Sequence, residues 1–124
     1  MPETITLPLP PNRANARGHW AQIHKERTQY QRKCLPLIYK TFGPIKPSPK
    51  YRHVRISMHF YVWSLNDWDN LIARAKWAWD ELVKTNIIAD DSPKYVDLGD
   101  VKQTVDRKHQ RLDLTLEATD DRNG

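Results

Sequence analysis

Two acidic pairs near the middle of the chain are the residues best suited to chemistry. Asp67 and Asp69 directly precede a segment with helical spacing, and Asp90 and Asp91 follow that segment in "ADDSP". Carboxylates held close together repel, and one stays protonated unless a cation joins them. Aspartate oxygens suit Mg²⁺ or Mn²⁺, which also accept substrate phosphate oxygens as ligands. The pattern therefore indicates metal-dependent chemistry at a phosphate, with these four aspartates as the metal ligands.

The elements that must position these acids are predicted by periodicity. Apolar residues alternate over residues 53–63, which predicts a strand. Helical spacing predicts helices over residues 19–39, with Pro36 kinking or ending the first, and over 70–84. We expect a short edge strand at 4–9, and a hairpin of strands at 95–105 and 111–118 with a bulge near Gly99.

These elements follow the order β-α-β-α-β-β, which predicts an α+β domain with a small mixed sheet and two helices. The chain has 124 residues, so we expect one domain, residues 1–117, followed by a flexible C-terminal tail, 118–124. The single cysteine, Cys34, excludes an internal disulfide. No apolar run is long enough for a membrane helix, and the first residues lack the layout of a signal peptide. We expect a cytoplasmic protein without a membrane partner.

The basic charge of the chain points to a polyanionic partner. There are 20 Lys and Arg against 15 Asp and Glu, a net charge of +5, with a pI near 9.4. The cations concentrate in the first third of the chain, and many of the acids lie between Asp67 and Asp100. This separation predicts a DNA-gripping surface beside an acidic site. The candidate DNA contacts are Arg13, Arg17, Trp20, Lys25, Arg32, Lys33 and Arg74.

The two acidic pairs can meet only if the chain folds back along the second helix. A helix over residues 70–84 rises about 22 Å, and residues 86–91 span about 20 Å when extended. The connection is therefore just long enough to return Asp91 beside Asp67 if Ile87 or Ile88 is buried on the way. Convergence is allowed by these lengths, although the sequence does not require it.

At these residues the sequence resembles the RusA family of Holliday-junction resolvases, small endonucleases encoded by phages and bacterial prophages. "ITLPLPPNRANARG" resembles the opening strand and loop of the family, and "DWDNL" resembles its D-x-D-N-L motif. "KWAWDEL" resembles its helix with a lysine and an aspartate, and "IIADDSPKYV" its D-D segment. The resemblance covers most of the chain, and its specificity comes from the last three of these segments, which follow the family's order.

The resemblance implies a Mg²⁺-dependent homodimer that resolves four-way DNA junctions by symmetrical phosphodiester hydrolysis in recombination and repair. It implies that Asp67, Asp69 and Asp91 bind metal and are catalytic, with Asp90 as their acidic neighbour. Lys76 matches the catalytic lysine, although it lies seven residues after Asp69 where the family commonly has four. Arg74 is the rival catalytic cation.

Each of these residues also has a structural interpretation. Asp69 can cap the helix, Asp90 and Asp91 can be turn residues, and Lys76 can pair with Asp80 one helical turn later. Together these interpretations describe a non-catalytic DNA-binding module. A phosphatase with a D-x-D nucleophile is disfavoured, because the chain is short for that fold and the strand ends before "SLN".

Overall fold

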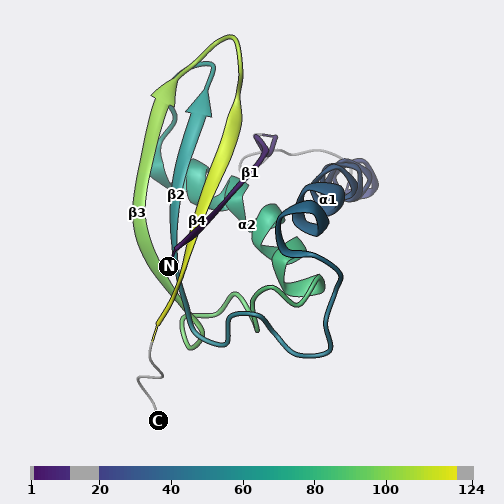
Figure 1. Cartoon of the computed structure of the whole chain (residues 1–124). Helices are drawn as coiled ribbons and strands as arrows, with labels where there is room; N and C mark the ends of the chain where they lie inside the picture. Colours follow the sequence, from purple (N-terminus) through teal and green to yellow (C-terminus); the bar gives the residue numbers. More distant parts are fainter. Residues whose placement is uncertain (1, 12–19, 120–124) are drawn as a thin grey trace.

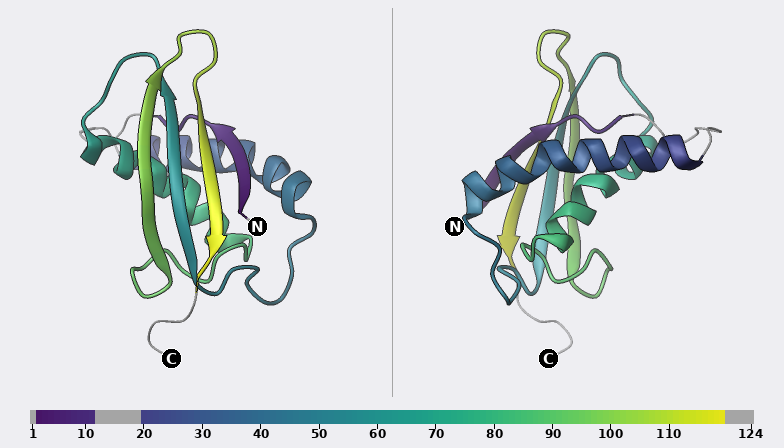
Figure 2. Two further views of the ribbon diagram at one scale, coloured as in Figure 1. Left: turned by 60° about the vertical axis from the view of Figure 1, so that its left-hand side comes forward. Right: turned by 90° about the vertical axis from the view of Figure 1, so that its right-hand side faces the viewer.

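β2 (Val54–Val62) lies inside the sheet, and its sequence explains why. Every second residue of this strand is buried, and the residues between them are exposed or half-buried. Such alternation places all the buried side chains on one face. In this computed structural model, which describes residues 2–11 and 20–119, that face is covered by α1 (Trp20–Phe42) and α2 (Trp68–Lys84) (Figure 2).

The sheet has four strands in the order β1-β4-β2-β3. β1 (Glu3–Pro8) pairs antiparallel with β4 (Arg111–Ala118), which pairs antiparallel with β2. β3 (Val96–Val105) pairs in parallel with β2 and forms one edge. The predicted α+β class, the element order, the mixed sheet and the two helices are confirmed.

The predicted hairpin of β3 and β4 is wrong, because β2 lies between these two strands (Figure 1). Parallel pairing requires a crossover, and α2 supplies it by carrying the chain back so that Val96 pairs with Val54. The loop of residues 106–110 then passes over the end of β2, where the Asp106 N–H donates to the Val62 carbonyl at 2.9 Å. Period-two alternation identifies both strands but does not say which neighbour each one takes.

The bulge predicted near Gly99 is confirmed. Ile56 pairs with Leu98 and Met58 with Val101, so Ser57 alone faces the two residues between them on β3. A Cβ atom on Gly99 would overlap Ser57 Oγ and lie 3.1 Å from the Ile56 carbonyl oxygen. Glycine therefore allows the two strands to approach this closely at the bulge.

α1 continues through Pro36 to Phe42, so the helix extends beyond its predicted end. Cys34 and Ile38 are buried on either side of the proline, and their packing favours continuation. The Tyr30 hydroxyl donates to the Pro8 carbonyl at 2.7 Å and thereby ties α1 to the end of β1. α2 begins two residues earlier than predicted and ends as predicted at Lys84.

The C-terminal strand passes the predicted domain boundary. Ala118 is the last residue of β4, and the N–H of Thr119 donates to the His53 carbonyl at 3.0 Å. The rest of the predicted tail, residues 120–124, lies outside the described residues. Within the described ranges, no helix has the length and apolar character needed to cross a membrane.

Candidate functional site

The first acidic pair lies at the start of α2, as the sequence predicts. Asp67 is the N-cap residue, with extended backbone angles, yet its side chain makes no capping hydrogen bond. Asp69 lies in the first helical turn, and both aspartates are exposed. With Asn66, Trp68 and Asn70 they line a surface depression. Capping therefore does not occupy the Asp67 carboxylate, and the capping position is not Asp69.

The backbone just before this pair is fixed against β3. The Asn66 N–H donates to Gln103 Oε1 at 3.0 Å, and Gln103 Nε2 donates back to the Asn66 carbonyl at 2.9 Å. Asn66 Nδ2 also donates to the Ser64 carbonyl at 2.8 Å. These bonds hold the connection from β2 to α2 in one conformation, so Asp67 starts from a defined position.

Arg74 supplies a cation beside this connection. Its Nε donates to the Pro10 carbonyl at 2.9 Å, and its Nη1 lies 3.4 Å from Asn66 Oδ1. Burial lowers the pKa of Arg74 from its ordinary value, and the guanidinium nevertheless stays charged at neutral pH. The side chain predicted to contact DNA therefore also joins the chain after β1 to the residue before Asp67.

The second acidic pair lies in the loop between α2 and β3. Ile88 pairs in parallel with Tyr51, three residues before β2, so the chain does turn back after α2. Ile87 and Ile88 are both buried, as the fold-back prediction requires. The return ends early, however, because the Ser92 carbonyl already accepts the N–H of Val96 at the start of β3.

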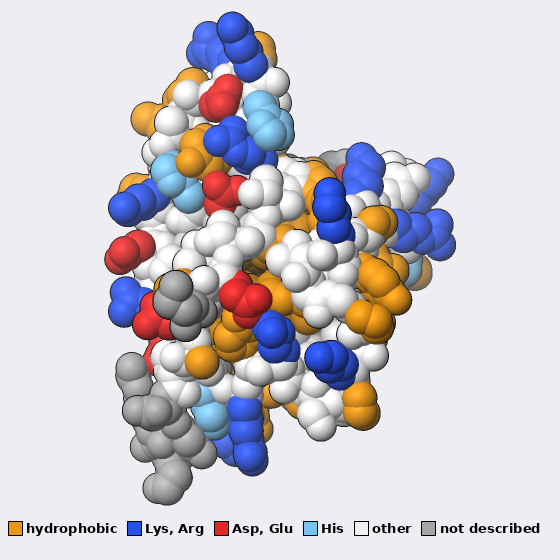
Figure 3. Space-filling view, viewed as in Figure 1, with side chains coloured by type: hydrophobic (Ala, Val, Ile, Leu, Met, Phe, Trp, Pro, Cys, Tyr) orange, Lys and Arg blue, Asp and Glu red, His pale blue; other side chains and the backbone are white. Residues whose placement is uncertain are grey.

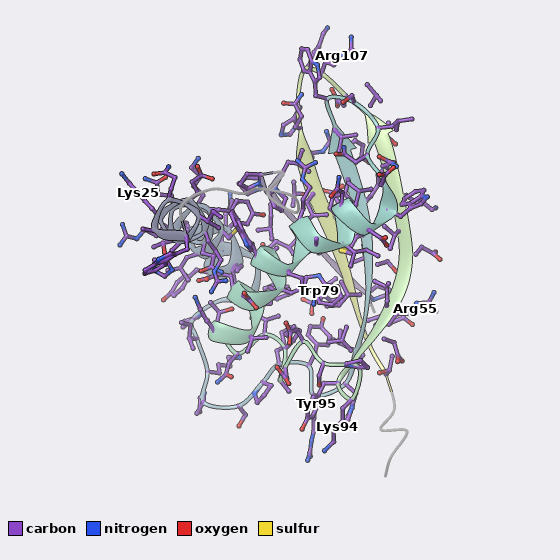
Figure 4. All side chains as sticks on the ribbon, turned by 180° about the vertical axis from the view of Figure 1, so that it is seen from behind. Lys25, Arg55, Trp79, Lys94, Tyr95 and Arg107 are labelled. Atoms are coloured by element: carbon purple, nitrogen blue, oxygen red, sulfur yellow. The ribbon has the colours of Figure 1, made fainter. Side chains whose placement is uncertain are left out.

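The sheet register shows how far apart the two pairs lie. Asn66 is bonded to Gln103, which pairs with Phe60, whereas Val96 pairs with Val54. Six residues of strand separate Phe60 from Val54, about 20 Å. Figure 4 labels a residue at each of these two ends of the sheet, Arg107 at one end and Tyr95 at the other.

A single chain thus does not bring the two acidic pairs together. Among residues 2–11 and 20–119, no three His, Cys, Asp or Glu side chains form a group able to hold a metal ion. The lengths that allowed convergence were upper limits. After α2 the chain runs back only as far as the pairing of Ile88 with Tyr51. Asp90 and Asp91 therefore stay near the start of β3.

The remaining predicted site residues lie on the two helices. Lys76 is exposed on α2, and Asp80, its predicted partner in the structural interpretation, instead lies 4.0 Å from Arg27 of α1. On α1, Trp20 is 76% exposed and Lys25, Arg32 and Lys33 are exposed. Lys and Arg side chains gather over this helix on the right of Figure 3. Arg13 and Arg17 lie outside the described residues.

Sequence reasoning missed Gln103, which positions the residue before Asp67. No local signal identifies it, because its contact depends on the parallel pairing of β2 and β3. Comparison with known proteins adds no family: no family model matches the chain, and no curated protein matches its sequence. The function is therefore argued from the residues and their geometry.

Proposed function

We propose that this protein is a Mg²⁺-dependent, structure-selective DNA endonuclease similar to the RusA family, which resolves Holliday junctions by symmetrical hydrolysis. The observation that carries the proposal is the exposed Asp67–Asp69 pair, in which the N-cap carboxylate makes no capping bond. The D-x-D-N-L resemblance and the basic face of α1 support it. We place the protein in the bacterial cytoplasm, with its gene carried by the bacterium or by a phage.

The chemistry of the pair fits a magnesium ion. Mg²⁺ keeps several waters and is commonly bound through one or two carboxylates together with substrate phosphates. Asp67 and Asp69 supply two carboxylates in an open depression, with Asn66 and Asn70 beside them. When bound, the metal supplies electrophilic activation of the phosphate and a more acidic water. Mn²⁺ satisfies the same donors.

The chain's own residues perform the other tasks. The hydrogen bonds between Asn66 and Gln103 fix the backbone position from which the Asp67 side chain extends. Lys76 or Arg74 provides positive charge for the phosphate, and Arg74 is the one held beside Asn66. The exposed cations of α1 grip the flanking DNA backbone. The proposed protein is a homodimer, since symmetrical incision needs two equivalent sites. Asp90 and Asp91 take part only if the dimer places them beside the other chain's site.

A cleavage assay tests this proposal. Labelled four-way junction and matched duplex are incubated with Mg²⁺ or with EDTA, using wild type, Asp67→Asn, Asp69→Asn and the exposed-acid control Asp100→Asn. We expect junction cleavage only with Mg²⁺, a loss of about 100-fold or more in the first two variants, and wild-type rates in the control. Cleavage that persists in EDTA or in Asp69→Asn contradicts the proposal.

The separation of the acidic pairs favours a second candidate, a non-catalytic DNA-binding module. In the described part of the chain, no group of three metal-ligating side chains forms, and Asp90 and Asp91 remain near the start of β3. Such a module binds DNA equally well with and without Mg²⁺ and cuts neither substrate. The same assay separates the two functions, because binding without cleavage in wild type supports only the second.

A further inference from the structure

An exposed tryptophan ring with an arginine guanidinium against its face lies at the end of β2. Trp63 follows β2 directly and is 59% exposed. The guanidinium carbon of Arg107 lies 5.1 Å from the centroid of the Trp63 ring, and Arg107 Nε donates to the Trp63 carbonyl at 3.2 Å. This arrangement holds a cation at the face of a large exposed ring.

The loop that carries Arg107 is braced by Asp106. Its Oδ1 accepts the N–H groups of Lys108 and His109, each at 3.1 Å, and its Oδ2 lies 3.2 Å from Arg111 Nη1. The two backbone hydrogen bonds, aided by Arg111, hold the pKa of Asp106 below its ordinary value. Because the carboxylate is used within the loop, the exposed Arg107 and Lys108 give the loop surface a positive character.

A second ring and cation lie on the adjoining open face of the sheet. His59 and Tyr61 stack with their ring centroids 4.2 Å apart and 11° between their planes. The guanidinium carbon of Arg111 lies 3.6 Å from the Tyr61 centroid, and because His59 stacks on one face of this ring, Arg111 covers the other. Arg111 is also paired with Asp106, so this pair supports the loop, and the ring left with an open face is that of Trp63. In Figure 3, Lys and Arg side chains lie at the top of the molecule, with histidines below them. Figure 4 labels Arg107 at this same end of the molecule.

We propose that Trp63, Arg107 and Lys108, called here the tip surface, bind the unpaired bases and the phosphates of single-stranded DNA. Planar bases stack on aromatic rings and guanidinium groups, and cations beside the rings attract the phosphates. A second copy of the chain would bring the same cations together, which disfavours self-association through this face. The partner that fits is both planar and anionic. This inference holds whether or not the Asp67–Asp69 pair cleaves DNA.

The test measures binding of the full chain in EDTA, so that cleavage plays no part. Fluorescence anisotropy compares a labelled 12-nucleotide oligo(dT) with a duplex of equal length. We expect Trp63→Ala to weaken oligo(dT) binding by roughly tenfold, and Arg107→Ala to weaken it as well. Trp63→Phe should retain most of the binding. Tyr39→Ala removes a ring that is 53% exposed on α1 and should bind like wild type.

Four results would overturn the inference: no binding of oligo(dT) by wild type, unchanged binding by Trp63→Ala, equal losses on oligo(dT) and duplex, or equal losses in Tyr39→Ala. Equal losses on both DNAs would indicate phosphate contact without stacking. Size-exclusion chromatography shows whether Trp63→Ala instead dissociates a dimer while leaving DNA binding unchanged, which also contradicts the inference. Circular dichroism verifies that each variant is folded. If Trp63→Ala does not fold, Trp63→Phe and Arg107→Ala provide the test in its place.

Discussion

Replacing Gly99 with alanine tests the close approach of β2 and β3 that carries Gln103 to the candidate site. The new Cβ would overlap Ser57 Oγ and lie 2.9 Å from Arg55 Nε and 3.1 Å from the Ile56 carbonyl oxygen. Rotating Ser57 away breaks its 3.2 Å bond from the Asp100 N–H, a loss of about 1 kcal/mol. Crowding against the Ile56 backbone costs a further 1–3 kcal/mol or so, and the alanine recovers about 0.4–1 kcal/mol through the unfolded state.

We therefore expect Gly99→Ala to lower the free energy of unfolding by about 1–3.5 kcal/mol. Urea unfolding followed by tryptophan fluorescence measures this change in wild type, Gly99→Ala, Ser57→Ala and the double variant. In the Ser57→Ala background the hydroxyl and its hydrogen bond are already absent, so the alanine at 99 should cost about 1 kcal/mol less. Wild-type stability in Gly99→Ala, or an equal cost in both backgrounds, would refute the reasoning.

Three further perturbations have defined outcomes. Arg74→Met removes the donors to Pro10 and Asn66, so urea unfolding should show a loss of about 1–2 kcal/mol, and unchanged stability would contradict the bracing role. Burial raises the pKa of the Cys34 thiol to about 11 from 9.0, and the unfolded thiol therefore ionises first as pH rises. The free energy of unfolding, relative to Cys34→Ala, should then fall between about pH 9 and 11; a rise would contradict this. The lowered pKa of Asp106 stabilises the fold above the ordinary aspartate pKa, and this contribution is lost on acidification. Asp106→Asn should show a weaker decrease in stability than wild type between pH 6 and 2, and equal decreases would exclude the bracing of the loop.

Periodicity predicted the helices and strands because burial of one face of an element requires apolar residues at regular intervals in its sequence. The alternation in β2 and the apolar face of α2 follow from which side chains leave water. The change of phase at Gly99 likewise predicted the bulge. The sequences of β3 and β4 contain no comparable pattern that indicates which strands they pair with. Each strand shows the same alternation whether it pairs with the other or with β2, and the crossover through α2 decided the outcome.

The candidate site was predictable only where its residues are adjacent in sequence. Asp67 and Asp69 lie at the start of α2 as expected, because a strand followed by an acidic connection and an apolar helical face leaves few alternatives. The position of Asp91 depends instead on Ile88 pairing with Tyr51, a contact between distant segments. The bonds from Gln103 to Asn66 depend on sheet register in the same way. Chain length limits such contacts and does not choose among them.

The most direct test of the central claim locates a divalent cation on the folded chain. Mn²⁺ is added to isotopically labelled protein, and the paramagnetic broadening of each backbone amide signal is measured by NMR, with excess Mg²⁺ as competitor. Our account predicts broadening centred on residues 66–70, reversed by Mg²⁺ and absent from the Asp67→Asn/Asp69→Asn variant. Broadening centred elsewhere, or unchanged in that variant, would contradict a cation site at the start of α2.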